Sequence, residues 1–156
     1  MARRHIFRFE PVLRLRQRRE DEQKRVVAGR LRKIRQIEDH QRALRTRIAQ
    51  QTEWTRRSLR GESVDIDALK WGRHWMIRLR RGVLDAEGEI GVHRALLAQE
   101  QAKLAQAAKE KRVLSRLKER RLALYLAEQE RREQLELDEM NGVRFARSVI
   151  SGDEAS

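Results

Sequence analysis

The stretch LKWGRHWMIRLRRGVLDAEGEIGVHRALLAQEQAKLAQA, residues 69–107, decides the fold. From its first residue, every seventh position is apolar, in the series Leu69, Met76, Val83, Ile90, Leu97 and Leu104. An apolar period of seven marks one position of a coiled-coil seam, so it predicts a long helix that packs on a partner helix. The second seam position is smaller and partly polar: Gly72, Leu79, Ala86, His93, Glu100 and Ala107. After residue 107 the phase shifts, and we expect the seam to continue through Leu114, Leu117 and Leu124.

An apolar stripe also runs through residues 11–60. Pro11 suits the first turn of a helix, where its missing N–H would have no intrahelical partner. This stretch contains one glycine, Gly29, and no proline after Pro11. Spacings of three, four and seven place its apolar residues on one broad face, which predicts a first helix over 11–60. These residues are Leu13, Val27, Leu31, Ile34, Ile37, Leu44, Ile48 and Leu59.

The clearest break between the helices is the segment 61–67. Gly61 can end the first helix, and Ser63, Asp65 or Asp67 can cap the second. We predict a second helix over about 68–141, ended by Asn141-Gly142, and a flexible tail over 143–156. Residues 1–142 are expected to form a single domain.

A short connection makes long helices antiparallel neighbours. With the turn centred near residues 63–64, residue i should lie beside residue 127 − i. The predicted fold is therefore all-α, a long antiparallel two-helix coiled coil with a thin apolar seam.

The composition agrees with this fold. Charged residues make up 39% of the chain, aromatic residues only 4%, and there is no cysteine. No disulfide or thiolate metal site can therefore stabilise the chain. We expect no transmembrane segment, no secretory signal and a cytoplasmic location, because no long apolar run is present.

The net charge of +13 is concentrated in the first helix. Residues 1–60 contain 19 Lys and Arg but only 7 Asp and Glu. A basic face attracts nucleic acid, anionic lipid and acidic protein alike, so charge alone does not choose among these partners.

The sequence predicts no catalytic, cofactor-binding or metal site. Its four histidines, His5, His40, His74 and His93, are scattered, and there is no glycine-rich phosphate loop or nucleophile motif. A two-helix coil also offers almost no concave pocket for catalysis. We therefore expect a non-enzymatic protein that works by docking to other proteins.

Three tryptophans gather near the predicted turn. Trp71 and Trp75 are four residues apart on one helical face, and the pairing rule places Trp75 close to Trp54. They either thicken the core near the turn or form a partly exposed patch for a partner, since tryptophan is favoured at interface hot spots.

Three segments of the chain resemble the FliJ family of flagellar type III export proteins. The opening has Phe7, Phe9, Val12, Leu13, Leu15 and Arg16, followed by Glu20-Asp21-Glu22. The middle, from Leu69 to Ala86, contains Trp75-Met76 and Leu79. The closing helix has Leu117-Lys118-Glu119-Arg120-Arg121, then Gln129, Arg132 and Glu136-Leu137-Asp138-Glu139.

This resemblance implies a coiled coil similar to the stalk (gamma) subunit of rotary ATPases. It implies a part in flagellum assembly, and so in motility and chemotaxis. The implied partners are the hexameric export ATPase and its regulator, the cytoplasmic domain of the export-gate membrane protein, and export chaperones. The implied location is peripheral, at the inner-membrane export apparatus. No cofactor and no specific nucleic acid are implied.

The resemblance also implies two sets of site residues. The gate-binding set maps onto Gln41, Arg45, Ile48, Thr52, Trp75, Leu79, Gly82 and Ala86. The antiparallel rule independently pairs these residues: 41 with 86, 45 with 82, 48 with 79 and 52 with 75. The ATPase-facing set is assigned to the paired termini, because contacts inside a pore should be mostly polar. It comprises Arg14, Arg18, Lys118, Arg120, Arg121, Arg132 and Asp138.

Two other functions remain open from the sequence. An equivalent rod protein of a virulence type III secretion injectisome would have the same fold in a different machine. A basic helical nucleic-acid-binding protein is the other alternative, although the chain contains no helix-turn-helix, zinc or bZIP arrangement.

Overall fold

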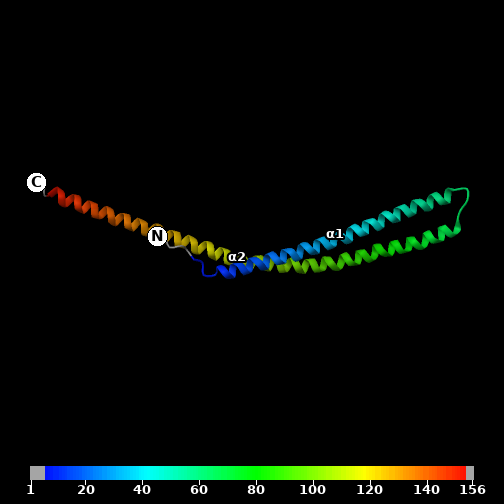
Figure 1. Cartoon of the computed structure of the whole chain (residues 1–156), viewed down its shortest axis with the longest axis horizontal. Coiled ribbons are helices and arrows are strands. Elements are labelled where there is room, and N and C mark those ends of the chain that lie inside the picture. Colours follow the sequence, from blue (N-terminus) through cyan, green and yellow to red (C-terminus); the bar gives the residue numbers. More distant parts are fainter. Residues whose placement is uncertain (1–5, 154–156) are drawn as a thin grey trace. The chain divides into compact units, whose positions relative to one another are not determined.

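The computed structural model describes residues 6–153 and contains two helices, α1 (Glu10–Arg60) and α2 (Ile66–Asp153) (Figure 1). The prediction of an all-α fold with two long helices that pack on each other is confirmed. The contacts form two units. The turn unit is Arg18–Ala108, and the terminal unit comprises residues 6–17 together with 109–153. Residues 1–5 of the predicted domain and 154–156 of the predicted tail lie outside the described residues.

Asp65 begins α2. Its Oδ1 accepts hydrogen bonds from the backbone N–H groups of Asp67 and Ala68, each at 3.1 Å. This is an N-cap, in which a side-chain oxygen pairs with N–H groups that have no partner within the helix. Of the three predicted capping residues, Asp65 therefore has this role.

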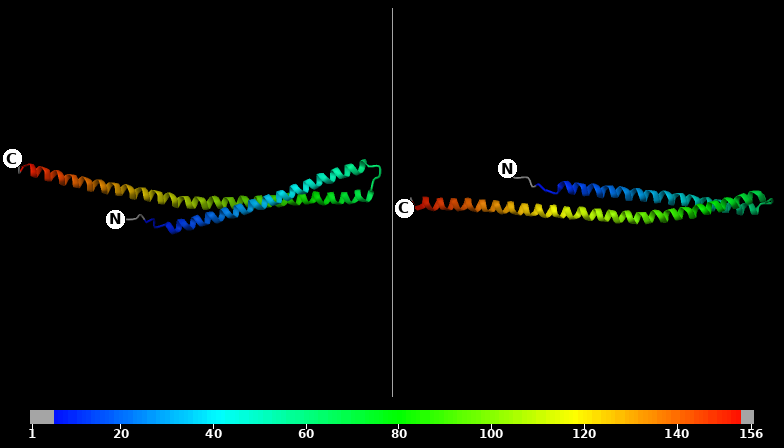
Figure 2. Two further views of the ribbon diagram at one scale, coloured as in Figure 1. Left: turned by 45° about the horizontal axis from the view of Figure 1, so that its top comes forward. Right: turned by 90° about the horizontal axis from the view of Figure 1, so that it is seen from below.

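Within the turn unit the two helices run side by side in opposite directions, which the further views also show (Figure 2). Gln23 donates to the backbone oxygen of Glu100 at 3.0 Å, and Gln41 donates to that of Val83 at 3.3 Å. As residue numbers rise along α1, those of the partners fall along α2. The antiparallel pairing is therefore confirmed, within about one helical turn of the predicted register.

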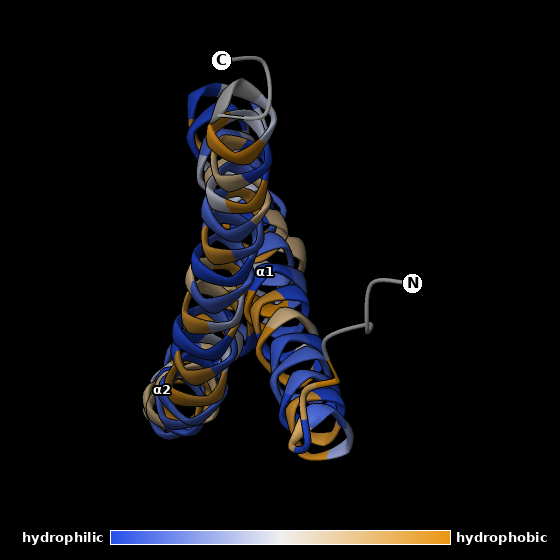
Figure 3. Ribbon diagram, turned by 90° about the vertical axis from the view of Figure 1, so that its left-hand side faces the viewer, coloured by the Kyte–Doolittle hydropathy of each residue, from blue (hydrophilic) through white to orange (hydrophobic). Residues whose placement is uncertain are grey.

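In the turn unit the core is a narrow seam between the two helices. Leu79, Ala86 and Ile90 are the most buried residues of α2, at 3%, 4% and 6% exposure. The remaining predicted seam positions from Leu69 to Ala107 are half-buried, and most of their neighbours are exposed. From α1, the seam receives Val27, Ile34, Ile37 and Leu44. Figure 3 shows both polar and apolar residues around each helix, as expected when only one stripe is covered.

A polar cluster interrupts this seam. Arg30 of α1 binds the Glu100 carboxylate through two nitrogens, at 2.8 Å from Nη2 to Oε1 and 3.2 Å from Nε to Oε2. Its Nη1 lies 2.9 Å from Nδ1 of His93. Because arginine only donates, His93 must accept at Nδ1. The hydrogen bond from Arg30 and the charge of Arg30 lower the pKa of the Glu100 carboxyl.

The terminal unit pairs the start of the chain with α2. Glu10 forms an ion pair with Lys118 at 2.8 Å, and Arg16 donates a hydrogen bond to Glu110. Phe7 is only 5% exposed and packs edge-on against Phe9, with ring centroids 5.9 Å apart. The aromatic residues before Pro11 therefore anchor the start of α1.

The predicted end of α2 at Asn141-Gly142 is wrong as a helix boundary. The helix continues through Asn141 and Gly142 to Asp153, and Gly142 does not adopt the positive φ of a helix-ending cap. The prediction that Leu124 continues the seam is also wrong, because Leu124 is 71% exposed and the neighbouring Tyr125 is half-buried instead. From residue 130 to 151 every side chain of α2 is exposed.

The ionised Glu100 should stabilise the hairpin at neutral pH. Its folded-state pKa is depressed, so this stability is present above the ordinary value of 4.5 and is lost as pH falls through the folded value. We expect Glu100→Gln to lower the thermal midpoint near pH 7. The difference in thermal midpoint between this variant and the wild type should shrink towards zero as the pH falls below 4.5. Thermal unfolding followed by circular dichroism at several pH values measures this.

Glu53→Gln is the matched control. Glu53 pairs with Arg57 at 3.3 Å on the exposed surface of α1, where ion pairs contribute little. If the control lowered the thermal midpoint as much as Glu100→Gln and with the same pH dependence, this would contradict a special role for the part-buried pair of Arg30 and Glu100.

The glycines of α2 should respond differently to alanine. At Gly88 an added Cβ meets no atom within 4 Å, so Gly88→Ala should raise the free energy of unfolding by about 1 kcal/mol. At Gly72 a Cβ would lie 2.6 Å from Nε2 of Gln51 and 3.3 Å from a ring carbon of Trp54. Gly72→Ala should therefore give a smaller gain or a loss. Urea unfolding of both variants tests this, and equal gains would contradict close packing at Gly72.

Candidate partner-binding surfaces

The residues assigned to gate binding all belong to the turn unit and come from both helices. The structure places the segments that contain them side by side: Gln41 donates to the backbone oxygen of Val83, and a Cβ at Gly82 would lie 3.1 Å from Cδ1 of Leu44. The predicted pairing of these segments therefore holds to within about a turn.

These residues differ in their access to a partner. Leu79 and Ala86 are buried at 3% and 4% exposure, so they cannot touch a partner while the hairpin is closed. Gly82 permits the close approach of Leu44. Arg45 and Trp75 are exposed, and Gln41, Ile48 and Thr52 are half-buried. A partner could contact these last five side chains directly, while the other three support the packing beneath them.

The hydroxyl of Thr52 is already used within its own helix. It donates to the backbone oxygen of Ile48 at 2.8 Å, so its methyl group is the part most available to a partner. Where this patch meets solvent it is therefore mainly apolar and aromatic, with Arg45 adding positive charge.

Most of the residues assigned to the ATPase lie in the terminal unit, and Arg18 alone belongs to the turn unit. Several already have partners within the chain. Lys118 binds Glu10 at 2.8 Å, and Arg132 binds Glu128 at 3.1 Å. Arg14 lies 4.0 Å from the Glu10 carboxylate. Arg18, Arg120 and Asp138 are exposed.

Arg121 has an intramolecular role that sequence reasoning missed. Its guanidinium carbon lies 5.3 Å from the centroid of Phe9 and 6.0 Å from that of Phe7. This is cation–π distance, so Arg121 attaches the start of the chain to α2. The pairing rule places Phe7 beside residue 120, and it could have indicated this contact.

The three tryptophans form a partly exposed patch near the turn. Trp71 is 76% exposed, Trp75 43% and Trp54 42%. A shallow concavity is lined by all three together with Gln51, Ala68 and Gly72. Of the two predicted roles, the partner patch fits Trp71 best, whereas Trp54 also packs over Gly72.

Metal-binding and membrane-spanning features were also sought among the described residues. In residues 6–153, no group of three or more His, Cys, Asp or Glu side chains is placed to hold a metal ion. Within the same range, neither helix has an apolar stretch long enough to cross a membrane.

The sequence was also compared with known proteins. The pattern that defines the family described as "Flagellar FliJ protein" matches residues 5–149. Searches of curated proteins and of solved structures found no match. Because the family match spans nearly the whole chain, including all of α1 and most of α2, this protein belongs to the FliJ family of flagellar export components.

Proposed function

We propose that this protein is a non-catalytic stalk of the flagellar export machinery. It inserts its terminal unit into the pore of the hexameric export ATPase and contacts the export gate through its turn unit. It also escorts export chaperones during flagellum assembly. The family match over residues 5–149 carries this proposal, because it includes the segments that supply both contact sets. The flagellar description of the family favours this machine over an injectisome.

The terminal unit suits a contact with a rotating or asymmetric ring. Its α2 segment presents exposed charges of both signs, including Arg120, Arg131 and Asp138. Polar contacts of this kind can form and break repeatedly, because each exposed ion pair contributes only a fraction of a kcal/mol, on the order of 0.5 kcal/mol. The exposed apolar side chains Leu135, Leu137 and Met140 add contact area along the same segment.

The turn unit suits a more specific contact. Trp75 and Arg45 belong to residue types enriched at interface hot spots. Each is exposed: Arg45 lies one residue from the buried seam residue Leu44, and Trp75 lies four residues before the buried seam residue Leu79. The protein would then be held at the inner membrane indirectly, through the cytoplasmic domain of the gate.

Charge reversal at Arg120 tests the ATPase contact. Arg120→Glu should weaken binding to the purified ATPase ring by roughly three- to tenfold, because an exposed favourable charge becomes unfavourable. Isothermal calorimetry with the full chain measures this. Arg94→Glu is the control, since Arg94 is an exposed arginine of the turn unit that pairs with Glu38. Unchanged ring affinity in Arg120→Glu, or an equal loss in the control, would refute the contact.

Alanine at Trp75 tests the gate contact. Trp75→Ala should weaken binding to the isolated gate domain by roughly thirtyfold if it is a hot spot. Leu79→Ala provides the comparison, because it creates a cavity in the seam and should lower the free energy of unfolding by about 2–3 kcal/mol. If the loss of gate affinity in the two variants followed only their loss of folding stability, Trp75 would support the fold and would not be a binding hot spot.

A further inference from the structure

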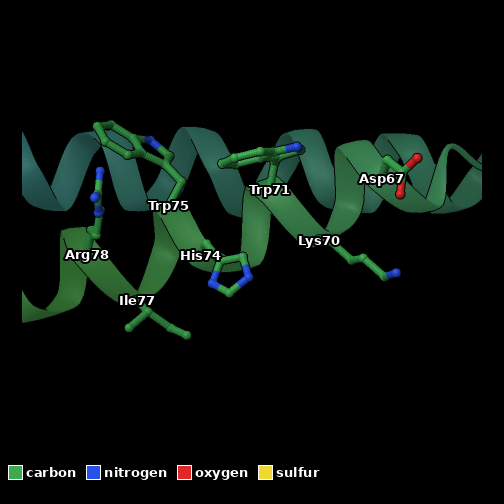
Figure 4. A pocket seen from close by; sticks show the side chains of 7 residues that line it. All are labelled: Asp67, Lys70, Trp71, His74, Trp75, Ile77 and Arg78. Atoms are coloured by element: carbon green, nitrogen blue, oxygen red, sulfur yellow. The ribbon is translucent and has the colours of Figure 1, made fainter.

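One exposed face of α2 near the turn combines aromatic, apolar and basic side chains. We call it the outer tryptophan face, and it consists of Asp67, Lys70, Trp71, His74, Trp75, Ile77 and Arg78. Trp71 and Trp75 also line the neighbouring concavity that includes Gln51 and Trp54 of α1. Trp71 is 76% exposed and Ile77 is 57% exposed, far more than the seam residues beside them. Figure 4 shows these side chains on α2 with α1 passing behind. Exposed aromatic and apolar side chains that line one shallow concavity indicate an interaction surface.

Basic side chains lie among these apolar groups. Lys70 and Arg78 are exposed, as are the neighbouring Arg73 and Arg81. Asp67 is the acidic residue that lines the same shallow concavity. The face therefore has net positive charge, and its favoured partner is anionic.

The combination of tryptophan with lysine and arginine favours one kind of anionic partner, a lipid surface. Tryptophan concentrates at membrane–water interfaces, where its ring lies at the level of the headgroups. Lysine and arginine extend their apolar stems over such a surface and place their charges at the lipid phosphates. The face is a shallow surface of one helix. A fluid lipid surface can adapt to this shape without a complementary pocket.

We propose that the outer tryptophan face binds the surface of an anionic membrane. Trp71 and Ile77 enter the headgroup region, and Lys70 and Arg78 contact lipid phosphates. This contact adjoins the proposed gate contact and shares Trp75 with it, whereas Trp71, Ile77 and the two cations lie outside the gate set. It would place the turn of the hairpin at the bilayer without any membrane-spanning segment.

The first test follows Trp71 alone. In the full chain carrying Trp54→Phe and Trp75→Phe, the remaining fluorescence comes from Trp71. Vesicles of equal parts phosphatidylcholine and phosphatidylglycerol should shift this emission to shorter wavelength and carry the protein upward in flotation. Vesicles of phosphatidylcholine alone should do neither. Equal binding to both vesicles, or to neither, overturns the proposal.

The second test separates this face from general positive charge. The pair Lys70→Gln and Arg78→Gln should weaken vesicle binding by about fivefold for each cation removed. The control pair Arg32→Gln and Lys33→Gln removes the same charge from exposed positions of α1 and should have a much smaller effect. Equal losses in the two pairs overturn the assignment to this face.

The third test distinguishes lipid from protein. Trp71→Ala should reduce vesicle partitioning by roughly tenfold. The same variant should bind the isolated gate domain as the wild type does. If gate-domain binding falls while vesicle binding is unchanged, the face is a protein surface and the membrane assignment is wrong. The thermal midpoint of each variant shows that the hairpin remains folded.

Discussion

The whole structure depends on one narrow apolar seam between α1 and α2. No described side chain in it falls below 2% exposure, so even its best-covered residues keep some contact with solvent. A seam this thin gives each helix little stability of its own, because a helix with one covered stripe gains only from that stripe. The hairpin is consequently stabilised by burial along its length together with specific polar contacts at a few positions, such as Arg30 with Glu100.

The seam is also the part of the fold that the sequence predicts best. The apolar residues from Leu69 to Leu104 recur every seven residues, a period typical of a helix that packs on another helix. Asp65 lies in the break between the helices that begins at Gly61. Together these features determine the helices, the turn and the antiparallel direction. The pairing rule also sets side by side the two segments that the family resemblance assigns to the gate. It could not show that Leu79 and Ala86 are buried while Trp75 is exposed, since neighbouring seam and flank positions differ only by rotation around the helix.

The features that sequence reasoning missed involve long side chains and helix ends. Arg30 reaches both His93 and Glu100, and a list of apolar positions does not include such a contact. The two polar seam positions lie opposite an arginine, and the pairing rule could have identified that match. The end of α2 was misplaced because Asn141-Gly142 is only a local stop signal. The residues after Gly142 include good helix formers, and the glycine keeps a helical conformation.

In a two-helix hairpin with a thin seam, the residues that stabilise the fold and the residues available to bind a partner overlap less than they do in a globular protein. In a globule, most side chains that contact a partner also cover the core, so one substitution changes both properties. Here Trp71 and Arg120 lie outside the seam, whereas Ile90 and Leu44 lie within it. Residues such as Arg121 and Trp75 belong to both classes, since each is partly exposed and also close to intramolecular neighbours. Such residues couple partner binding to the integrity of the hairpin, because a ligand that displaces Arg121 from Phe9 must also loosen the start of α1.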